Sequence, residues 1–389
     1  MVCYVLIYSY GVNCMKKLFS VLLAVLMVGC GNVAQQGPAV EESKNLTTVC
    51  SYLSGEIKGA DNGWYEVMRH SDGTADIVYT DVSAGTRSVF GDARSINVPY
   101  GSLSAVFVAD GYVYHYFYGF PESMGKEENN SILYQYDTDG KLLQTKVFEA
   151  EEKFTIGSAV VSDGENLYFS GYGNEKFNIY TVNQNNLEAQ TFYQSDDQFE
   201  LTGGYKNQLV LFVIKDGKRT MELLDTFTLE RKVLFETRFP WYMLDENRLY
   251  NYQDQKSVLK TYSLENGRQS DIRLFDKDDC VNNWQIPYSA TGGRYLAVYT
   301  SQYEGNYEKA YIYDLHTEKL TEVQRFYGKA VPAKIGNQIY YLAPASEQRV
   351  FLNSGLTERI DYNYIIVSLE NLCDGNGNNI KVENQIEYR

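Results

Sequence analysis

This sequence of 389 residues lacks the motifs that mark the common enzyme classes. It contains no G-x-S-x-G nucleophile elbow, no P-loop, no H-E-x-x-H zinc motif and no G-x-G-x-x-G after a strand. Only three histidines are present, and the six cysteines have no C-x-x-C spacing, so neither a metal site nor a disulfide framework is predicted. We therefore expect no cofactor and favour a non-enzymatic function. A pair of carboxylates that cleaves polysaccharide stays open as the alternative, because no motif marks such a pair.

Basic residues are also scarce. The chain has 35 Lys and Arg against 50 Asp and Glu, which gives a net charge of −15. A nucleic-acid partner requires a basic face that neutralises phosphates, so we exclude this class of partner. The acidity keeps the protein soluble, and it could also attract a cationic partner.

The segment Met15–Cys30 has the order of charged and apolar residues found in export signals. Lys16 and Lys17 come first, a mostly apolar run follows from residue 18 to residue 28, and a glycine precedes Cys30. The run is shorter than the ~20 residues that a membrane-spanning helix needs. The end of this segment resembles the bacterial lipobox, in which the cysteine receives lipid, such as palmitate, before cleavage on its N-terminal side.

The lipobox resemblance implies a signal peptide at residues 1–29 and lipidation of Cys30. The mature protein would then be extracytoplasmic, anchored by lipid to the bacterial cell membrane or the outer membrane. Met27 stands where the lipobox prefers Leu, and an ordinary secretory signal or an N-terminal membrane helix is the alternative. Residues 1–14 precede a second start at Met15, and we interpret them as the product of a start assigned too early. Residues 30–47 are mostly small and polar, so we expect a flexible, lipid-anchored tether.

Tyrosine is abundant, with 35 residues, and it favours strands with half-buried faces. A repeat of about 40 to 46 residues runs along the chain: a short strand, a turn of Asp, Asn or Gly, a Tyr-rich strand and two further strands. Seven such units can be counted, from Trp64–Met68 to a last predicted strand at Ile380–Tyr388. One unit is predicted to contain the strands Phe154–Ser162, Asn166–Gly171, Lys176–Val182 and Leu187–Tyr193.

A four-stranded repeat of this length is typical of a β-propeller blade. A single blade cannot bury its two faces, whereas a closed ring of blades can. We therefore predict an all-β fold, with a β-propeller at residues 48–389 that has seven four-stranded blades, six or eight being the alternatives. In architecture the chain resembles the WD40/YVTN/quinoprotein-like propeller superfamily. It lacks the repeated Trp-Asp and double-glycine motifs found there, so the resemblance implies a fold and transfers no functional residue.

The loops at the two ends of such a propeller differ in this sequence. Loops that join one blade to the next, or the second strand to the third, are long and varied, whereas the other turns are short. Varied loops on a rigid scaffold are where binding sites are usually found. We expect the tether to lead into the innermost strand of the first blade, and therefore to lie at the same end as the long loops.

Aromatic and amide side chains gather at this long-loop end. Trp241–Tyr242 and Asn283–Trp284 fall near the start of the innermost strands of two adjacent predicted blades. A Trp ring can stack on a sugar while amides bind its hydroxyls, and it can also anchor a peptide. We predict that Trp241, Tyr242, Asn283 and Trp284 bind a ligand. Packing between blades is the alternative interpretation.

Acidic residues gather in three predicted connections between blades, where they could attract a cationic partner or Ca²⁺. These clusters are Glu149, Glu151 and Glu152; Asp196, Asp197 and Glu200; and Asp276, Asp278 and Asp279. None has the spacing of a calcium loop, and a solvated acidic rim is the alternative interpretation.

These features favour a membrane-anchored propeller that binds a protein, peptide or glycan without catalysis. In gross plan the chain looks like the propeller lipoprotein of the outer-membrane β-barrel assembly machinery, although it lacks the repeated motifs of that family. A polysaccharide-active enzyme with carboxylates in the central channel, and a sensory ectodomain, are the alternatives.

Overall fold

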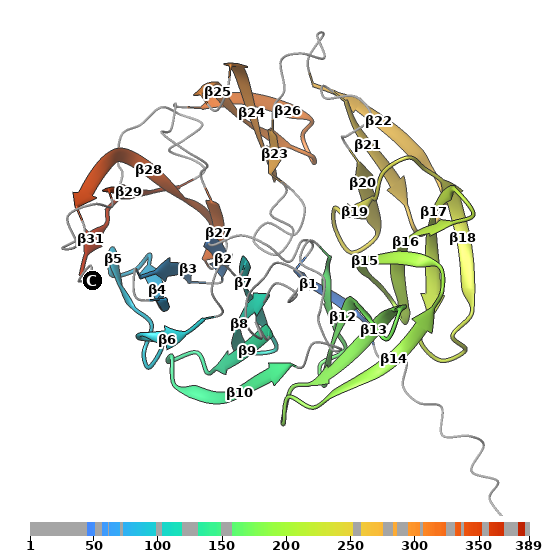
Figure 1. Cartoon of the computed structure of the whole chain (residues 1–389). Helices are drawn as coiled ribbons and strands as arrows, with labels where there is room; N and C mark the ends of the chain where they lie inside the picture. The colour runs from blue at the N-terminus through green and yellow to red at the C-terminus, as the bar shows by residue number, and fades with distance from the viewer. Residues whose placement is uncertain are drawn as a thin grey trace, which may run out of the picture. The chain divides into compact units, whose positions relative to one another are not determined.

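In the residues that the structure describes, the regular structure consists of β-strands that group into seven sheets, each built on four consecutive antiparallel strands (Figure 1). The computed structural model describes residues 45–50, 57–60, 62–70, 73–98, 103–118, 131–148, 158–251, 258–274, 283–285, 295–303, 306–323, 331–335, 338–351, 358–368 and 380–385. Asn45–Arg389 forms one compact unit. Within the described ranges, no helix is long and apolar enough to cross a membrane.

We number the sheets 1 to 7 in chain order. Sheet 1 contains β2 (Ile57–Ala60), β3 (Gly63–Arg69), β4 (Thr74–Asp81) and β5 (Thr86–Val89), with β6 (Ile96–Asn97) also paired to β4. Sheet 2 contains β7 (Leu103–Ala109), β8 (Tyr112–Tyr118), β9 (Ser131–Tyr136) and β10 (Leu142–Phe148). Sheet 3 contains β11 (Val160–Ser162), β12 (Asn166–Gly173), β13 (Lys176–Asn183) and β14 (Ala189–Ser195). Sheet 4 contains β15 (Gln198–Tyr205), β16 (Gln208–Lys215), β17 (Lys218–Asp225) and β18 (Arg231–Glu236).

The remaining three sheets follow the same order. Sheet 5 contains β19 (Tyr242–Met243), β20 (Arg248–Asn251), β21 (Val258–Ser263) and β22 (Gln269–Arg273). Sheet 6 contains β23 (Asn283–Gln285), β24 (Tyr295–Tyr303), β25 (Asn306–Asp314) and β26 (Lys319–Val323). Sheet 7 contains β27 (Val331–Ile335), β28 (Gln338–Phe351), β29 (Glu358–Ser368) and β30 (Ile380–Lys381).

Short polar side chains shape the turns between the third and fourth strands. In sheet 4, the Oδ1 atom of Asp225 accepts hydrogen bonds from the backbone N atoms of Phe227 and Thr228 at 2.9 and 3.0 Å. Leu229, four residues after the aspartate, has a φ of 57°. Asn183 makes the same kind of bond to a backbone N two residues later. Aspartate and asparagine close such turns readily, which explains why the third strands of sheets 1, 3, 4 and 6 end in Asp or Asn.

Apolar side chains fill the spaces between neighbouring sheets. Along β8, Tyr114 and Tyr116 pack toward sheet 3, whereas Val113 and Phe117 pack toward sheet 1, because successive residues of a strand point to opposite faces. Buried clusters of this kind join sheets 1–2, 2–3, 3–4, 4–5, 5–6 and 7–1. This succession of sheets is a β-propeller. The predicted all-β propeller is confirmed, and the number of sheets lies within the predicted range of six to eight.

The C-terminal strand connects the last sheet to the first. The sequence predicts one strand at Ile380–Tyr388, but the structure divides this segment between β30 in sheet 7 and β31 (Glu383–Asn384), which pairs in parallel with β5 of sheet 1. The backbone N of Glu383 donates to the O of Gly85 at 2.8 Å. The single predicted strand is therefore wrong, because its second half satisfies the open edge of another sheet.

The N-terminal strand lies in an unexpected sheet. The strand β1 (Thr47–Cys50) pairs antiparallel with β11 of sheet 3, so it does not join the first sheet. β1 contacts β7 of sheet 2 and β15 of sheet 4 as well. β1 lies beside β11, on the side away from β12, and is the fifth strand of sheet 3.

Each sheet has two ends, which the strand directions define. The first strand begins at the connector end, where the chain arrives from the preceding sheet, and it finishes at the opposite, turn end. In sheet 4, Gln198 marks the connector end and Lys206 follows the first strand at the turn end. The backbone N of Leu46 donates to the O of Lys206 at 2.6 Å, so the described chain starts at the turn end. The first described residues therefore enter at the turn end and not, as expected, at the long-loop end; residues 30–44 of the predicted tether lie outside the described residues.

Candidate functional site

Trp241 stands immediately before β19, the first strand of sheet 5, and its ring is buried. Only 5% of the residue is exposed. Its Nε1 donates to Oγ1 of Thr237 at 2.9 Å, and its ring meets Phe235 edge-on with centroids 5.1 Å apart. Trp241 thus packs between sheets 4 and 5 in this structure, which is the alternative to ligand binding named above. A ligand contact at Trp241 stays a prediction.

Tyr242, the next residue, is half-buried and connects two sheets. Its hydroxyl donates to Oε1 of Glu200 on β15, at 3.0 Å. Its ring also lies against Tyr250, with centroids 6.3 Å apart. Glu200 lies near the beginning of β15, and Tyr242 begins β19. The pair therefore joins sheets 4 and 5 at their connector ends, where long loops were expected to form a binding site.

The backbone before Tyr242 is held by the same sheet. The side-chain Nδ2 of the buried Asn251, at the end of β20, donates to the O of Pro240 at 2.8 Å. With Trp241 buried on one side, this bond fixes where β19 begins and therefore where the hydroxyl of Tyr242 points. A rigid strand is a better support for a binding group than a free loop.

Burial raises the pKa of the Glu200 carboxyl to about 6, and the hydrogen bond from Tyr242 offsets part of that effect. A carboxyl group with this pKa is largely ionised at neutral pH, although its surroundings favour the protonated form. Titratable residues whose pKa is shifted by burial and by a specific partner are enriched at functional sites. Glu200 and Tyr242 are therefore the strongest candidate site among the described residues.

We expect Glu200→Gln to stabilise the fold at neutral pH. The pKa of Glu200 is higher in the folded protein than in the unfolded chain. The contribution of Glu200 to the free energy of unfolding is therefore fully present below about pH 4.5 and is lost as pH rises through about 6. A neutral amide keeps an acceptor for Tyr242 and avoids this loss. The free energy of unfolding, measured with urea, should rise by about 2 kcal/mol at pH 7 and remain unchanged at pH 4. The exposed Glu246→Gln is the matched control, and an equal gain at both pH values would contradict the assignment.

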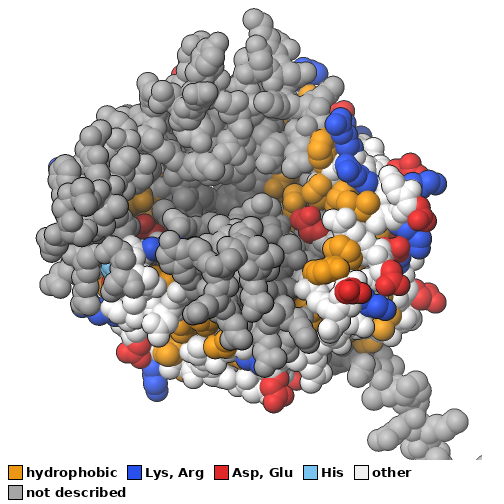
Figure 2. Space-filling view, in the orientation of Figure 1, with side chains coloured by type: hydrophobic (Ala, Val, Ile, Leu, Met, Phe, Trp, Pro, Cys, Tyr) orange, Lys and Arg blue, Asp and Glu red, His pale blue; other side chains and the backbone are white. Residues whose placement is uncertain are grey.

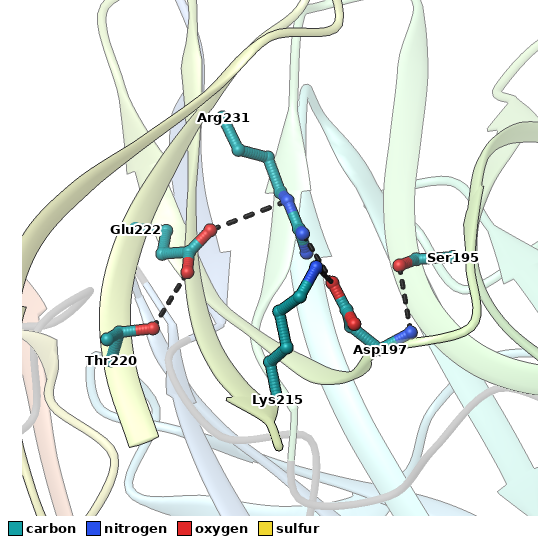
Figure 3. A network of polar contacts seen from close by, with 6 residues as sticks. All are labelled: Ser195, Asp197, Lys215, Thr220, Glu222 and Arg231. Atoms are coloured by element: carbon teal, nitrogen blue, oxygen red, sulfur yellow. Dashed lines mark hydrogen bonds and ion pairs between the residues drawn. The ribbon is translucent and has the colours of Figure 1, made fainter. Parts of the chain in front are cut away.

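Two other acids of sheet 4 and the connection before it, Asp197 and Glu222, are paired with basic side chains, unlike Glu200 (Figure 3). Asp197 accepts hydrogen bonds from Nη2 of Arg231 at 2.5 Å and Nζ of Lys215 at 3.3 Å, and the Arg231 bond is the main cause that lowers its pKa. Nε of Arg231 lies 3.4 Å from Oε2 of Glu222, whose other oxygen accepts the hydroxyl of Thr220 at 2.7 Å. Asp197 is therefore engaged within the fold, and a cationic ligand would have to compete with two basic side chains. On the described part of the face shown in Figure 2, acidic and basic side chains are likewise interspersed.

The remaining predicted site residues are placed only in part. Asn283 and Trp284 lie in β23, opposite Tyr299 and Val298 of β24, and only their backbone is described. Cys30 lies outside the described residues, as do the acidic clusters at 149–152 and 276–279. The ligand-binding role of Tyr242, Asn283 and Trp284 stays a prediction. Sequence reasoning named Glu200 as one acid of a cluster, but it missed the pairing with Tyr242.

No protein-family model matches this chain, and no curated protein matches it. Solved structures match it at low identity. TolB from Acinetobacter baumannii is 13% identical, with 74% of this chain and 75% of that chain covered and a TM-score of 0.39. The β-propeller domain of the Trilobed protease from Pyrococcus furiosus is 13% identical, with 85% and 97% covered and a TM-score of 0.46. An acylaminoacyl peptidase is 14% identical, with 80% and 53% covered and a TM-score of 0.45. Such similarity concerns the fold alone and assigns no activity to this chain.

Proposed function

We propose that this protein is an exported lipoprotein whose propeller binds a protein, peptide or glycan without catalysing a reaction. The order of residues in Met15–Cys30 supports export and attachment of lipid to Cys30. The connecting residues 31–44 then hold the propeller near the bacterial cell membrane or outer membrane. Replacing Cys30 with Ser removes the thiol that would carry the lipid, so membrane fractionation of this variant tests the placement.

The hydrogen bond between Tyr242 and Glu200 is the observation that carries the binding proposal. It places a donor-acceptor hydroxyl and an ionisable carboxylate together at the connector ends of sheets 4 and 5. The carboxylate has a raised pKa, so its position costs stability at neutral pH. A hydrogen-bond donor from a ligand, such as an amine or a sugar hydroxyl, would recover part of that cost by pairing with the ionised carboxylate.

A binding function fits this arrangement better than glycoside cleavage does. Cleavage by the usual mechanism needs two carboxylates that flank the bond, one as acid and the other as base or nucleophile. Asp197, the acid closest to Glu200 along the chain in the same connection, is held by Arg231 and Lys215. Glu200 is instead oriented by a tyrosine hydroxyl, which suits a fixed acceptor for a bound ligand.

A screen against glycan and peptide arrays tests this function directly. For any ligand that the purified wild-type protein retains, we expect Tyr242→Phe, which loses the hydroxyl, and Glu200→Gln, which loses the carboxylate charge, each to weaken affinity about tenfold. The exposed Glu246→Gln should bind like the wild type. Unchanged affinity in both site variants would contradict the assignment. Turnover of a glycan that disappears when a single Asp or Glu is replaced would favour the enzyme alternative.

A further inference from the structure

The edge of sheet 3 that carries β1 differs from the corresponding edges of the other sheets. β1 pairs there through Thr47 with Ser162, Thr48 with Val161 and Cys50 with Val160. In the described part of the chain, sheet 3 alone has a strand added beside its first strand. More than 100 residues separate β1 from its partner, so this strand reaches its site as a remote segment. An extended segment that completes an exposed edge is the arrangement seen in strand-addition recognition.

The side chains of this segment alternate between the protein and its surroundings. Leu46, Thr48 and Cys50 are buried at 7%, 2% and 5% exposure, whereas Thr47 is exposed. Leu46 packs into the cluster between sheets 3 and 4, and Cys50 packs into the cluster between sheets 2 and 3. The two outer positions of the segment are therefore held by apolar groups on either side of sheet 3.

A hydrogen bond holds Thr48, the central residue of the segment. Oγ1 of Thr48 accepts the backbone N–H of Gly204 at 2.9 Å. A Cβ atom on Gly204 would lie 2.7 Å from Cγ1 of Val161 and 3.0 Å from Cβ of Leu46. Glycine is therefore required for the close approach of the segment to β15.

We propose that the inner edge of sheet 3 is an acceptor site for an extended peptide from another protein, occupied here by residues 45–50 of the chain itself. The site fits a segment that pairs antiparallel with Val160–Ser162. Its side chains at alternate positions are an aliphatic group, a hydroxyl group and a small apolar group. Three residue pairs hold β1, so the backbone contribution is small and a second peptide can compete for the edge.

The test uses full-length variants and a fluorescein-labelled peptide with the sequence of residues 45–50. Leu46→Asp in the protein should release its own strand, because it places a charge in an apolar site. This variant should bind the labelled peptide at least about tenfold more tightly than the wild type does, measured by fluorescence anisotropy. A peptide with Asp in place of its leucine should not bind. Thr47→Asp changes an exposed side chain of the same strand and should behave like the wild type.

Gly204→Ala, added to Leu46→Asp, should abolish binding of the labelled peptide, because the new methyl group meets Val161 and the incoming leucine. If Leu46→Asp fails to fold by circular dichroism, Thr48→Val is the milder variant that removes only the acceptor for Gly204. Two results would overturn the proposal. One is a folded variant that does not distinguish the peptide from its Asp counterpart, and the other is binding that Gly204→Ala leaves unchanged.

Discussion

Arg87→Met should lower the free energy of unfolding by about 3 to 5 kcal/mol at pH 7, because it removes one partner of a buried ion pair. Nε and Nη2 of Arg87 lie 3.0 and 2.5 Å from Oε2 of Glu66. The Arg87 side chain is 1% exposed and that of Glu66 is 11% exposed. Without the guanidinium, the Glu66 carboxylate would have to stay charged in an apolar setting or take up a proton.

This pair lies where the last sheet meets the first. The guanidinium of Arg87 stands over the ring of Tyr364 of β29, with its central carbon 5.4 Å from the ring centroid. Trp64 of sheet 1 and Val82, which follows β4, belong to one apolar cluster with Leu342 and the same tyrosine of sheet 7. Loss of the guanidinium therefore weakens the contact that closes the propeller as well as the ion pair.

The double variant Arg87→Met/Glu66→Leu is the control that separates charge from packing. A buried ion pair replaced by two apolar side chains of similar volume is often neutral in stability, so most of the loss should be recovered. Urea unfolding of the wild type, both single variants and the double variant gives the coupling between the two sites. A single variant that loses less than about 1 kcal/mol would contradict the argument, and so would a double variant as unstable as Arg87→Met.

Local sequence patterns predicted the strands well. The strands expected at Asn166–Gly171 and Lys176–Val182 occur at Asn166–Gly173 and Lys176–Asn183. Alternating apolar residues and Asp or Asn turns act over a few residues, so the sequence alone carries this information. The repeat of these units then led to the propeller, because only neighbouring sheets can bury both faces of each blade.

Pairings between remote segments could not be predicted in the same way. β1 and β31 each complete an edge in a sheet far along the chain, and an edge strand of two to four residues has no pattern that names its partner. The same limit applies to the candidate site. As neighbours at the start of a strand, Trp241 and Tyr242 are expected to point to opposite faces. Which of them is buried depends on Phe235 and Thr237, which contact Trp241. The pairing of Tyr242 with Glu200 depends on how two sheets pack.

His115 should make the fold sensitive to acid, and His115→Leu should remove much of that sensitivity. The residue is fully buried on β8, and its ring lies edge-on to Phe117 with the ring centroids 5.0 Å apart. Neither ring nitrogen has a hydrogen-bond partner among the residues that the structure describes. Burial, aided by the charge of Arg69, lowers the pKa of His115 to about 3.

The direction of the pH effect follows from this pKa. Below about pH 6.5 the unfolded chain binds a proton at His115 that the folded protein does not, so stability falls as pH falls toward about 3. Between pH 7 and pH 4 the loss from this one residue should be about 3 kcal/mol. A leucine of similar volume binds no proton and leaves no buried polar atom unsatisfied, so His115→Leu should also be at least as stable as the wild type at pH 7.

Urea unfolding of the wild type and His115→Leu at pH 7 and pH 4 measures this difference. Other groups titrate in the same range, among them Glu200, whose effect has the opposite sign, so the comparison between variant and wild type isolates His115. His316→Gln is the matched control, because it replaces an exposed histidine in the turn after β25. If the His115→Leu variant loses as much stability as the wild type between the two pH values, the buried imidazole is not the acid-sensitive group. A variant less stable at pH 7 would instead show that the ring nitrogens have partners that stabilise the fold.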